Sequence, residues 1–178
     1  MPSTPRRSEL PAVWREPTSR LPLHWGTYRG RYLAGLTLIV GGGIHLLGAN
    51  VWTLHFLLVG TVAHAAGWAI LPAQGWRRVT AVAPSVATIW IVLTGPQALW
   101  AITLSFTCWL LVRHRPLRSY LTVLFPLVTG IAIAQYFREL SGMPVALAIA
   151  MTVAVASAWI ARMIEGPRAP VPARRGAA

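Results

Sequence analysis

A run of forty residues without a charged side chain, Tyr32 to Leu71, constrains the fold more than any other feature of the sequence. As one α-helix, rising about 1.5 Å per residue, it would extend roughly 60 Å, twice the hydrocarbon thickness of a bilayer. The run must therefore fold back on itself. Residues 48–50, Gly-Ala-Asn, form its polar break and place the turn there. This pattern predicts a transmembrane hairpin containing His45, His55 and His64.

The composition is typical of a protein whose surface meets lipid. The chain is 55% hydrophobic and 11% charged, with a mean hydropathy of +0.55, whereas soluble domains have about a quarter charged residues. Its net charge of +12 comes from sixteen arginines against four glutamates. Because the arginines stand at the ends of apolar segments, we expect no nucleic-acid partner. Membrane lipids, with anionic headgroups at the cytoplasmic side, are the expected partners of this charge.

Turn signals divide the chain into six expected helices. Residues 72–75 end the first hairpin, Gly95-Pro96 splits the uncharged segment 79–112, and residues 138–142 separate the last two helices. The predicted fold class is all-α: a polytopic membrane protein with six transmembrane helices as three hairpins. The expected helices span about 32–49, 51–71, 79–94, 97–112, 119–137 and 143–164, and the expected domains are a cytoplasmic Arg/Pro-rich tail 1–31, a transmembrane domain 32–164 and a cytoplasmic tail 165–178.

The distribution of arginine predicts how the helices are oriented. If both termini are cytoplasmic, fifteen of the sixteen arginines lie in cytoplasmic segments and only Arg138 lies outside. Basic residues are enriched on the cytoplasmic side of membrane proteins, so the N-in, C-in orientation with an even number of crossings is favoured. We expect the chain to be integral to the cytoplasmic (inner) membrane of a bacterium.

The expected spans lack the groups that most enzymes need. None contains a carboxylate, and the sequence has no paired acids for hydrolysis, no zinc-protease motif and no phosphate-binding loop. We therefore expect that the protein is not an enzyme.

The histidines are the groups in the expected spans that titrate near neutral pH. One interpretation is structural, with each neutral imidazole hydrogen-bonded to a neighbouring helix. A second interpretation is a cofactor site: Gly41 precedes His45 by four residues, and Gly60 precedes His64 by four. A glycine there leaves flat space beside the imidazole ring. The spacing resembles that of light-harvesting antenna helices that ligate bacteriochlorophyll, which implies haem or bacteriochlorophyll as the cofactor.

A third interpretation is a site for a metal ion or small polar solute in the outer half of the bundle. His45 and His55 each lie four residues from an end of the turn, so on an antiparallel hairpin they share a depth of roughly 6 Å. Two histidines alone do not complete a zinc site. The polar residues expected in this half, and hence the candidate ligands, are His45, Asn50, His55, Gln97, Gln135 and Glu139.

Two functions fit this pattern. The first is a non-catalytic integral membrane subunit that packs in or stabilises a larger membrane complex with other subunits, in one form ligating a tetrapyrrole. Short outer turns and surfaces of small residues, such as the alanines at positions 146, 150, 154 and 158, favour it. The alternative is a small-solute or metal binding or transport component, which is similar in size to the substrate-binding components of vitamin or metal uptake systems.

Overall fold

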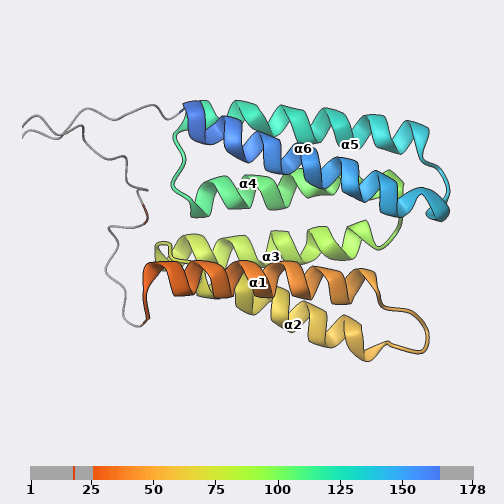
Figure 1. Cartoon of the computed structure of the whole chain (residues 1–178), viewed down its shortest axis with the longest axis horizontal. Coiled ribbons are helices and arrows are strands. Elements are labelled where there is room, and N and C mark those ends of the chain that lie inside the picture. The colour runs from red at the N-terminus through yellow and green to blue at the C-terminus, as the bar shows by residue number, and fades with distance from the viewer. Residues whose placement is uncertain (1–17, 19–25, 165–178) are drawn as a thin grey trace, which may run out of the picture.

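The described part of the chain, residue 18 and residues 26–164, is helical and contains no strand in this computed structural model. Six α-helices run side by side along its long axis (Figure 1). The prediction of an all-α fold with six helices is confirmed. Their bounds are α1 Tyr28–Leu47, α2 His55–Ile70, α3 Gly75–Val92, α4 Ile102–Val112, α5 Leu124–Tyr136 and α6 Met143–Ile164, and the 3₁₀ helices η2 Pro96–Ala101, η3 Leu117–Val123 and η4 Leu140–Gly142 lead into α4, α5 and α6.

Local hydrogen bonds move two helix starts from their predicted positions. α1 begins before residue 32 because Thr27 caps it: the Thr27 hydroxyl accepts a hydrogen bond from the Gly30 amide at 3.1 Å. α2 begins after residue 51 because Asn50 organises a turn, its Oδ1 accepting from the Trp52 amide at 2.9 Å. The predicted tails, 1–31 and 165–178, lie outside the described residues except for Thr18 and residues 26–31.

Two pairs of glycines bring α1 and α2 into backbone contact. A Cβ on Gly60 would stand 2.7 Å from the carbonyl oxygen of Gly42, and a Cβ on Gly67 would stand 2.7 Å from that of Gly35. No side chain fits at these distances, so the two backbones lie directly against each other, as small residues allow in membranes. The pairs are seven residues apart on both helices and run in opposite order, so α1 and α2 are antiparallel.

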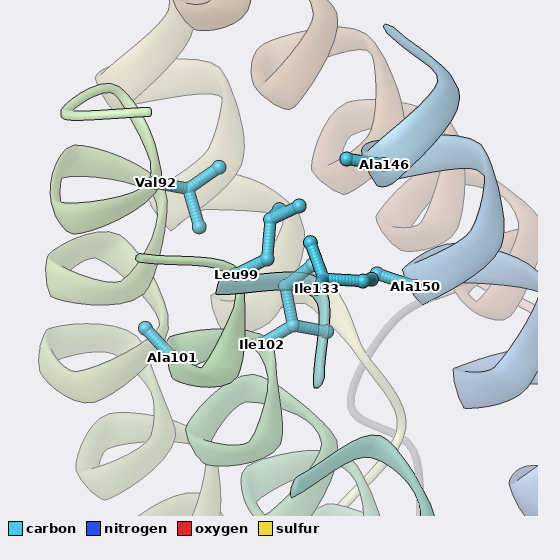
Figure 2. Packing of buried hydrophobic residues seen from close by; sticks show 7 residues of the cluster. All are labelled: Val92, Leu99, Ala101, Ile102, Ile133, Ala146 and Ala150. Carbon is cyan, nitrogen blue, oxygen red and sulfur yellow. The ribbon is translucent and has the colours of Figure 1, made fainter. Parts of the chain in front are cut away.

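A second core joins α3, η2, α4, α5 and α6. The Thr88 hydroxyl of α3 lies 3.2 Å from the carbonyl oxygen of Ala101 and links α3 to the end of η2. Gly130 of α5 lies against the backbone of Trp100 in η2. Ala146 and Ala150, half of the alanine surface predicted on α6, are buried here. Figure 2 shows the cluster, which consists of Val92, Leu99, Ala101, Ile102, Ile133, Ala146 and Ala150.

Large apolar side chains cover the outside of the helices. Leu58 of α2 is 69% exposed and Val128 of α5 is 63% exposed. Such a continuous apolar exterior suits contact with lipid better than contact with water. Within residues 26–164, three helical segments are long and apolar enough to cross a membrane: Tyr28–Leu47, Leu117–Tyr136 and Leu140–Ile164. Two shorter apolar segments are His55–Ile70 and Pro96–Val112.

Candidate functional site

His64 of α2 is buried, and both of its ring nitrogens are in hydrogen bonds. Its Nδ1 lies 3.0 Å from the carbonyl oxygen of Ile39 on α1, and the Trp68 indole N–H donates to its Nε2 at 3.1 Å. Because a carbonyl oxygen only accepts, Nδ1 carries the proton and Nε2 accepts, which holds the imidazole neutral in one tautomer. This is the arrangement expected of a structural histidine that joins two helices.

The predicted cofactor pair Gly60 and His64 stays a prediction, and its surroundings disfavour a bound ring. The space beside Gly60 is filled by α1, since a Cβ there would stand 2.8 Å from Leu46 Cγ. A metal on His64 Nε2 would also have to displace the Trp68 indole. The glycine at this position serves helix contact, which the four-residue spacing alone does not distinguish from space for a macrocycle.

The second predicted cofactor pair, Gly41 and His45, differs from Gly60 and His64 because it faces outward from α1. No atom lies within 4 Å of the place where a Gly41 Cβ would stand. The His45 Nδ1–H donates to the Gly41 carbonyl oxygen at 2.9 Å, which leaves the lone pair on Nε2 as the metal-ligating position. The Phe56 ring of α2 packs against the imidazole at 5.2 Å between centroids and orients it.

A shallow groove of about 430 Å³ runs beside Gly41 on the outer face of α1. It is open on most sides, so it is a surface groove and not an enclosed pocket. It is formed by α1 alone and lined by Leu36, Thr37, Val40, Gly41 and Ile44. The structure therefore separates the two predicted glycines: Gly41 lines an open groove, and Gly60 is enclosed between helices.

The predicted outer site is divided between two parts of the bundle. Asn50 belongs to the loop between α1, which carries His45, and α2, which carries His55. Both imidazoles pack on the Phe56 ring, at centroid distances of 5.2 Å for His45 and 4.7 Å for His55. Within the described residues, no group of three His, Cys, Asp or Glu side chains is placed to hold a metal ion.

Two of the other predicted ligands lie away from these histidines. Gln135 is near the end of α5 and Glu139 follows it, on the far side of α3 and α4 from the α1–α2 pair (Figure 1). Gln97 lies at the start of η2, where its amide donates to the Thr94 carbonyl oxygen at 2.8 Å. The structure therefore does not bring the six predicted residues together, because the sequence does not specify which pairs of helices are neighbours.

Arginines at the opposite end of the bundle cap α2 and α4. Arg31 Nε lies 3.1 Å from the carbonyl oxygen of Ile70, and Arg78 also donates to the last turn of α2. Arg77 Nη1 lies 3.0 Å from the carbonyl oxygen of Leu111, near the end of α4. The last carbonyls of a helix have no partner within it and carry partial negative charge, which the guanidinium groups neutralise.

Arg113 is buried at the same end. It donates to the Tyr28 hydroxyl at 2.8 Å, and its guanidinium lies over the rings of Tyr32 and Trp109, at 4.8 Å and 5.5 Å from their centroids. Sequence reasoning assigned the arginines to topology and missed these contacts. The described arginines at this end (Figure 1) are Arg29, Arg31, Arg77, Arg78, Arg113, Arg115, Arg118 and Arg162, whereas Arg138 lies at the other end beside Glu139.

No protein-family model, curated protein or solved structure matches this chain. The geometry of its residues is therefore the basis on which a function is assigned.

Proposed function

We propose that this chain is a non-catalytic integral membrane subunit that joins a larger membrane complex and carries a tetrapyrrole on α1. The expected form in the membrane is six crossings as three hairpins, with both termini in the cytoplasm. The exposed apolar side chains and the three long apolar helices support insertion in lipid. The gathering of eight described arginines at one end supports the orientation, because that end would be the cytoplasmic one.

The observation that carries the proposal is the pairing of a free histidine nitrogen with open space. His45 directs its Nδ1–H to the Gly41 carbonyl, so Nε2 is the ring nitrogen that remains for a ligand. Haem and chlorophyll metals accept such a nitrogen as an axial ligand and supply the redox or light-absorbing chemistry when bound. The groove beside Gly41 offers an apolar surface for one face of the ring.

Phe56 supports the same assignment. Its ring contacts His45 from α2 and limits how far the imidazole can turn. The hydrogen bond to Gly41 and this ring contact together hold the ligand nitrogen before a macrocycle arrives, which lowers the entropic cost of binding. His55 also contacts the Phe56 ring, yet no glycine clears space four residues before His55, where Val51 stands.

The test is spectroscopic. The chain is purified in mild detergent, with and without added haem or bacteriochlorophyll, and the Soret or far-red band is recorded. We expect a shifted band in the wild type, its loss in His45→Ala, and its loss in Gly41→Phe, which fills the groove. His55→Ala is the matched control and should keep the band. No shifted band in the wild type, or equal loss in His55→Ala, would overturn the assignment.

The complex is tested separately. The subunit is isolated from its native membrane in mild detergent, and the stoichiometry of co-purifying proteins is measured by mass spectrometry. We expect partner membrane proteins in fixed ratio. A solitary monomer, stable without partners, would contradict the role as a subunit while leaving the tetrapyrrole site open to its own test.

A second candidate function is a metal or small-solute binding component with its site in the outer half. The observation that favours it is that His45 and His55 pack on one phenyl ring, so two imidazoles lie on one patch at the outer end. Binding of Zn²⁺ or Cu²⁺ measured by calorimetry distinguishes it, since His55→Ala should abolish metal binding but leave the tetrapyrrole band intact.

A further inference from the structure

We propose that Arg77 and His114 form a binding site for a phosphate group at the arginine-rich end of the bundle. This site is independent of the groove on α1 and of any tetrapyrrole. It lies where α3 begins and α4 ends. Three observations carry the proposal: the backbone of His114, the contact that fixes Arg77 beside it, and the buried donor atoms that both side chains leave without a partner.

The first observation is an unfavourable backbone conformation at His114. This residue follows the end of α4 and has a φ of 55°, in the left-handed region. Among the described residues, no other non-glycine residue has a positive φ. The Arg115 amide donates to the Leu110 carbonyl at 3.0 Å and the His114 amide to the Leu111 carbonyl at 3.2 Å, the hydrogen bonds of a common helix ending. Glycine is the preferred residue at this position, so an imidazole is retained here at a local cost.

The second observation is that one carbonyl joins the two residues. The Leu111 oxygen that accepts from the His114 amide also accepts from Arg77 Nη1, at 3.0 Å. The guanidinium also lies over the ring of Trp76, at 5.1 Å from its centroid. Arg77, near the start of α3, is therefore positioned next to His114, which follows the end of α4, before any ligand binds.

The third observation concerns the atoms that remain. Arg77 Nε and His114 Nε2 are both buried, and neither has a hydrogen-bond partner among the described residues. A buried polar atom without a partner is unfavourable, and a bound ion is one of the explanations for such an atom in a native protein. Capping of α4 accounts for Arg77 Nη1 but not for Nε.

The chemistry of these atoms selects the ligand. Arg77 Nε always donates, and His114 Nε2 donates in one neutral tautomer and in the charged form, so the pair offers two N–H groups to an oxyanion. Phosphate accepts several such hydrogen bonds, and arginine matches its geometry well. Among the described residues the one carboxylate, Glu139, lies at the other end of the bundle, so no described acidic side chain competes for the site.

The electrostatic surroundings agree with an anion. Burial, and then the positive charge of Arg77, lower the pKa of His114, so the imidazole is neutral without a ligand. A phosphate beside it would favour the charged form and gain a stronger hydrogen bond. The position, at the cytoplasmic ends of α3 and α4 in the proposed orientation, is where the headgroups of anionic phospholipids lie.

Thermal unfolding in membranes of defined composition tests the site. The purified chain is placed in nanodiscs of digalactosyldiacylglycerol alone, a neutral lipid without phosphate, or with added phosphatidylglycerol, or with added oleate as an anionic lipid without phosphate. We expect phosphatidylglycerol to raise Tm and oleate to raise it less. Arg77→Gln and His114→Gly should lose the difference between the two anionic lipids. Arg138→Gln, at the other end, is the matched control and should keep it.

His114→Gly also separates binding from a structural role. Glycine suits the left-handed conformation, so in the galactolipid alone this variant should be at least as stable as the wild type, with an equal or higher Tm. If His114 only supports the fold, Tm should fall in every lipid. An equal or raised Tm in the galactolipid alone, together with a lost phosphatidylglycerol effect, is the result that the proposal requires.

A second arm distinguishes the two sources of phosphate. Inorganic phosphate is added to nanodiscs of the galactolipid alone and compared with chloride at equal ionic strength. An increase in Tm that depends on Arg77 and His114 identifies a free phosphate ligand, whereas an increase with phosphatidylglycerol alone identifies a lipid headgroup. The proposal is overturned if neither source stabilises the wild type, or if both variants respond as the wild type does.

Discussion

Two adjacent glycines on α1 provide a direct test of the contact between α1 and α2. Gly41 faces open space, with no atom within 4 Å of its Cβ position, whereas a Cβ on Gly42 would stand 2.6 Å from the Gly60 carbonyl oxygen and 3.0 Å from His64 Cα. The same substitution, glycine to alanine, should therefore have opposite effects at neighbouring positions. Gly41→Ala gains helix propensity and nothing else, so it should stabilise the fold by about 0.5–1 kcal/mol.

Gly42→Ala carries the same gain but forces the two helices apart. An ordinary carbon–oxygen contact is at least about 3.3 Å, so α1 must retreat by several tenths of an ångström from Gly60. Overpacking of this kind costs about 1–3 kcal/mol. The retreat also stretches the hydrogen bond between His64 and Ile39, now 3.0 Å, which contributes about 0.5–1.5 kcal/mol. The two variants should therefore differ by at least about 1.5 kcal/mol, with Gly42→Ala the less stable.

The assay is reversible unfolding by sodium dodecyl sulfate in mixed micelles, followed by far-UV circular dichroism. Near-UV circular dichroism reports in addition on the environment of buried tryptophans such as Trp68. The reasoning is refuted if Gly42→Ala unfolds at the same or a higher detergent fraction than Gly41→Ala, because the backbone contact described above would then not exist.

The remaining predictions concern other parts of the bundle. Trp68→Phe should destabilise the chain by about 1–3 kcal/mol in the same assay, because it leaves the buried His64 Nε2 without its donor; a change no larger than that for an exposed tryptophan would contradict this. In a background without the native cysteine, Ser141→Cys should react with a membrane-impermeant maleimide from outside the cell, and Arg118→Cys only after permeabilisation; the reverse pattern would exclude the orientation. Burial and a neighbouring arginine lower the pKa of His114 below its ordinary 6.5. Because the unfolded chain then binds the proton more readily than the folded chain, His114 does not lower the free energy of unfolding above pH 6.5. As the pH drops from 6.5 towards the folded pKa, the free energy of unfolding falls. His114→Gly should therefore lose less stability than the wild type between pH 7.5 and pH 5. Equal losses would contradict the lowered pKa of His114.

The elements of the fold could be predicted because their signals are local. The polar break at residues 48–50 and Gly95-Pro96 separate helices in the structure as they do in the sequence. Gly95, at φ of 125°, adopts a conformation that other residues rarely adopt. The predicted helix ends differ from the observed ones, because a cap such as Thr27 or a turn such as that of Asn50 depends on single hydrogen bonds.

The candidate site could be predicted only in part, because function depends on contacts between helices. The spacing of Gly41 and Gly60 before their histidines is identical in sequence, yet one glycine faces open space and the other faces α1. Trp68 lies four residues after His64, on the same face, and that spacing was the available signal for its role. The link from His64 to Ile39 crosses between helices and has no such signal.

The arginine-rich end illustrates a different limit. The charge pattern predicts that these arginines share a side of the membrane, but it does not reveal that Arg77 reaches α4. The left-handed conformation of His114 likewise follows from how α4 ends. A histidine before Arg115-Pro116 does not by itself predict a left-handed conformation, because glycine is the residue that usually indicates one.

The matched glycine spacing on α1 and α2 determines which changes of length the chain can absorb. One residue inserted between Gly60 and Gly67 would rotate the rest of α2 by about 100°, carrying Gly67 off the contact and bringing a bulkier residue into its place. The same insertion in the loop after α1 would leave both pairs aligned, because the loop lies beyond them. Variation in length should therefore be confined to that loop, and either helix should gain or lose residues only in multiples of seven and together with its neighbour.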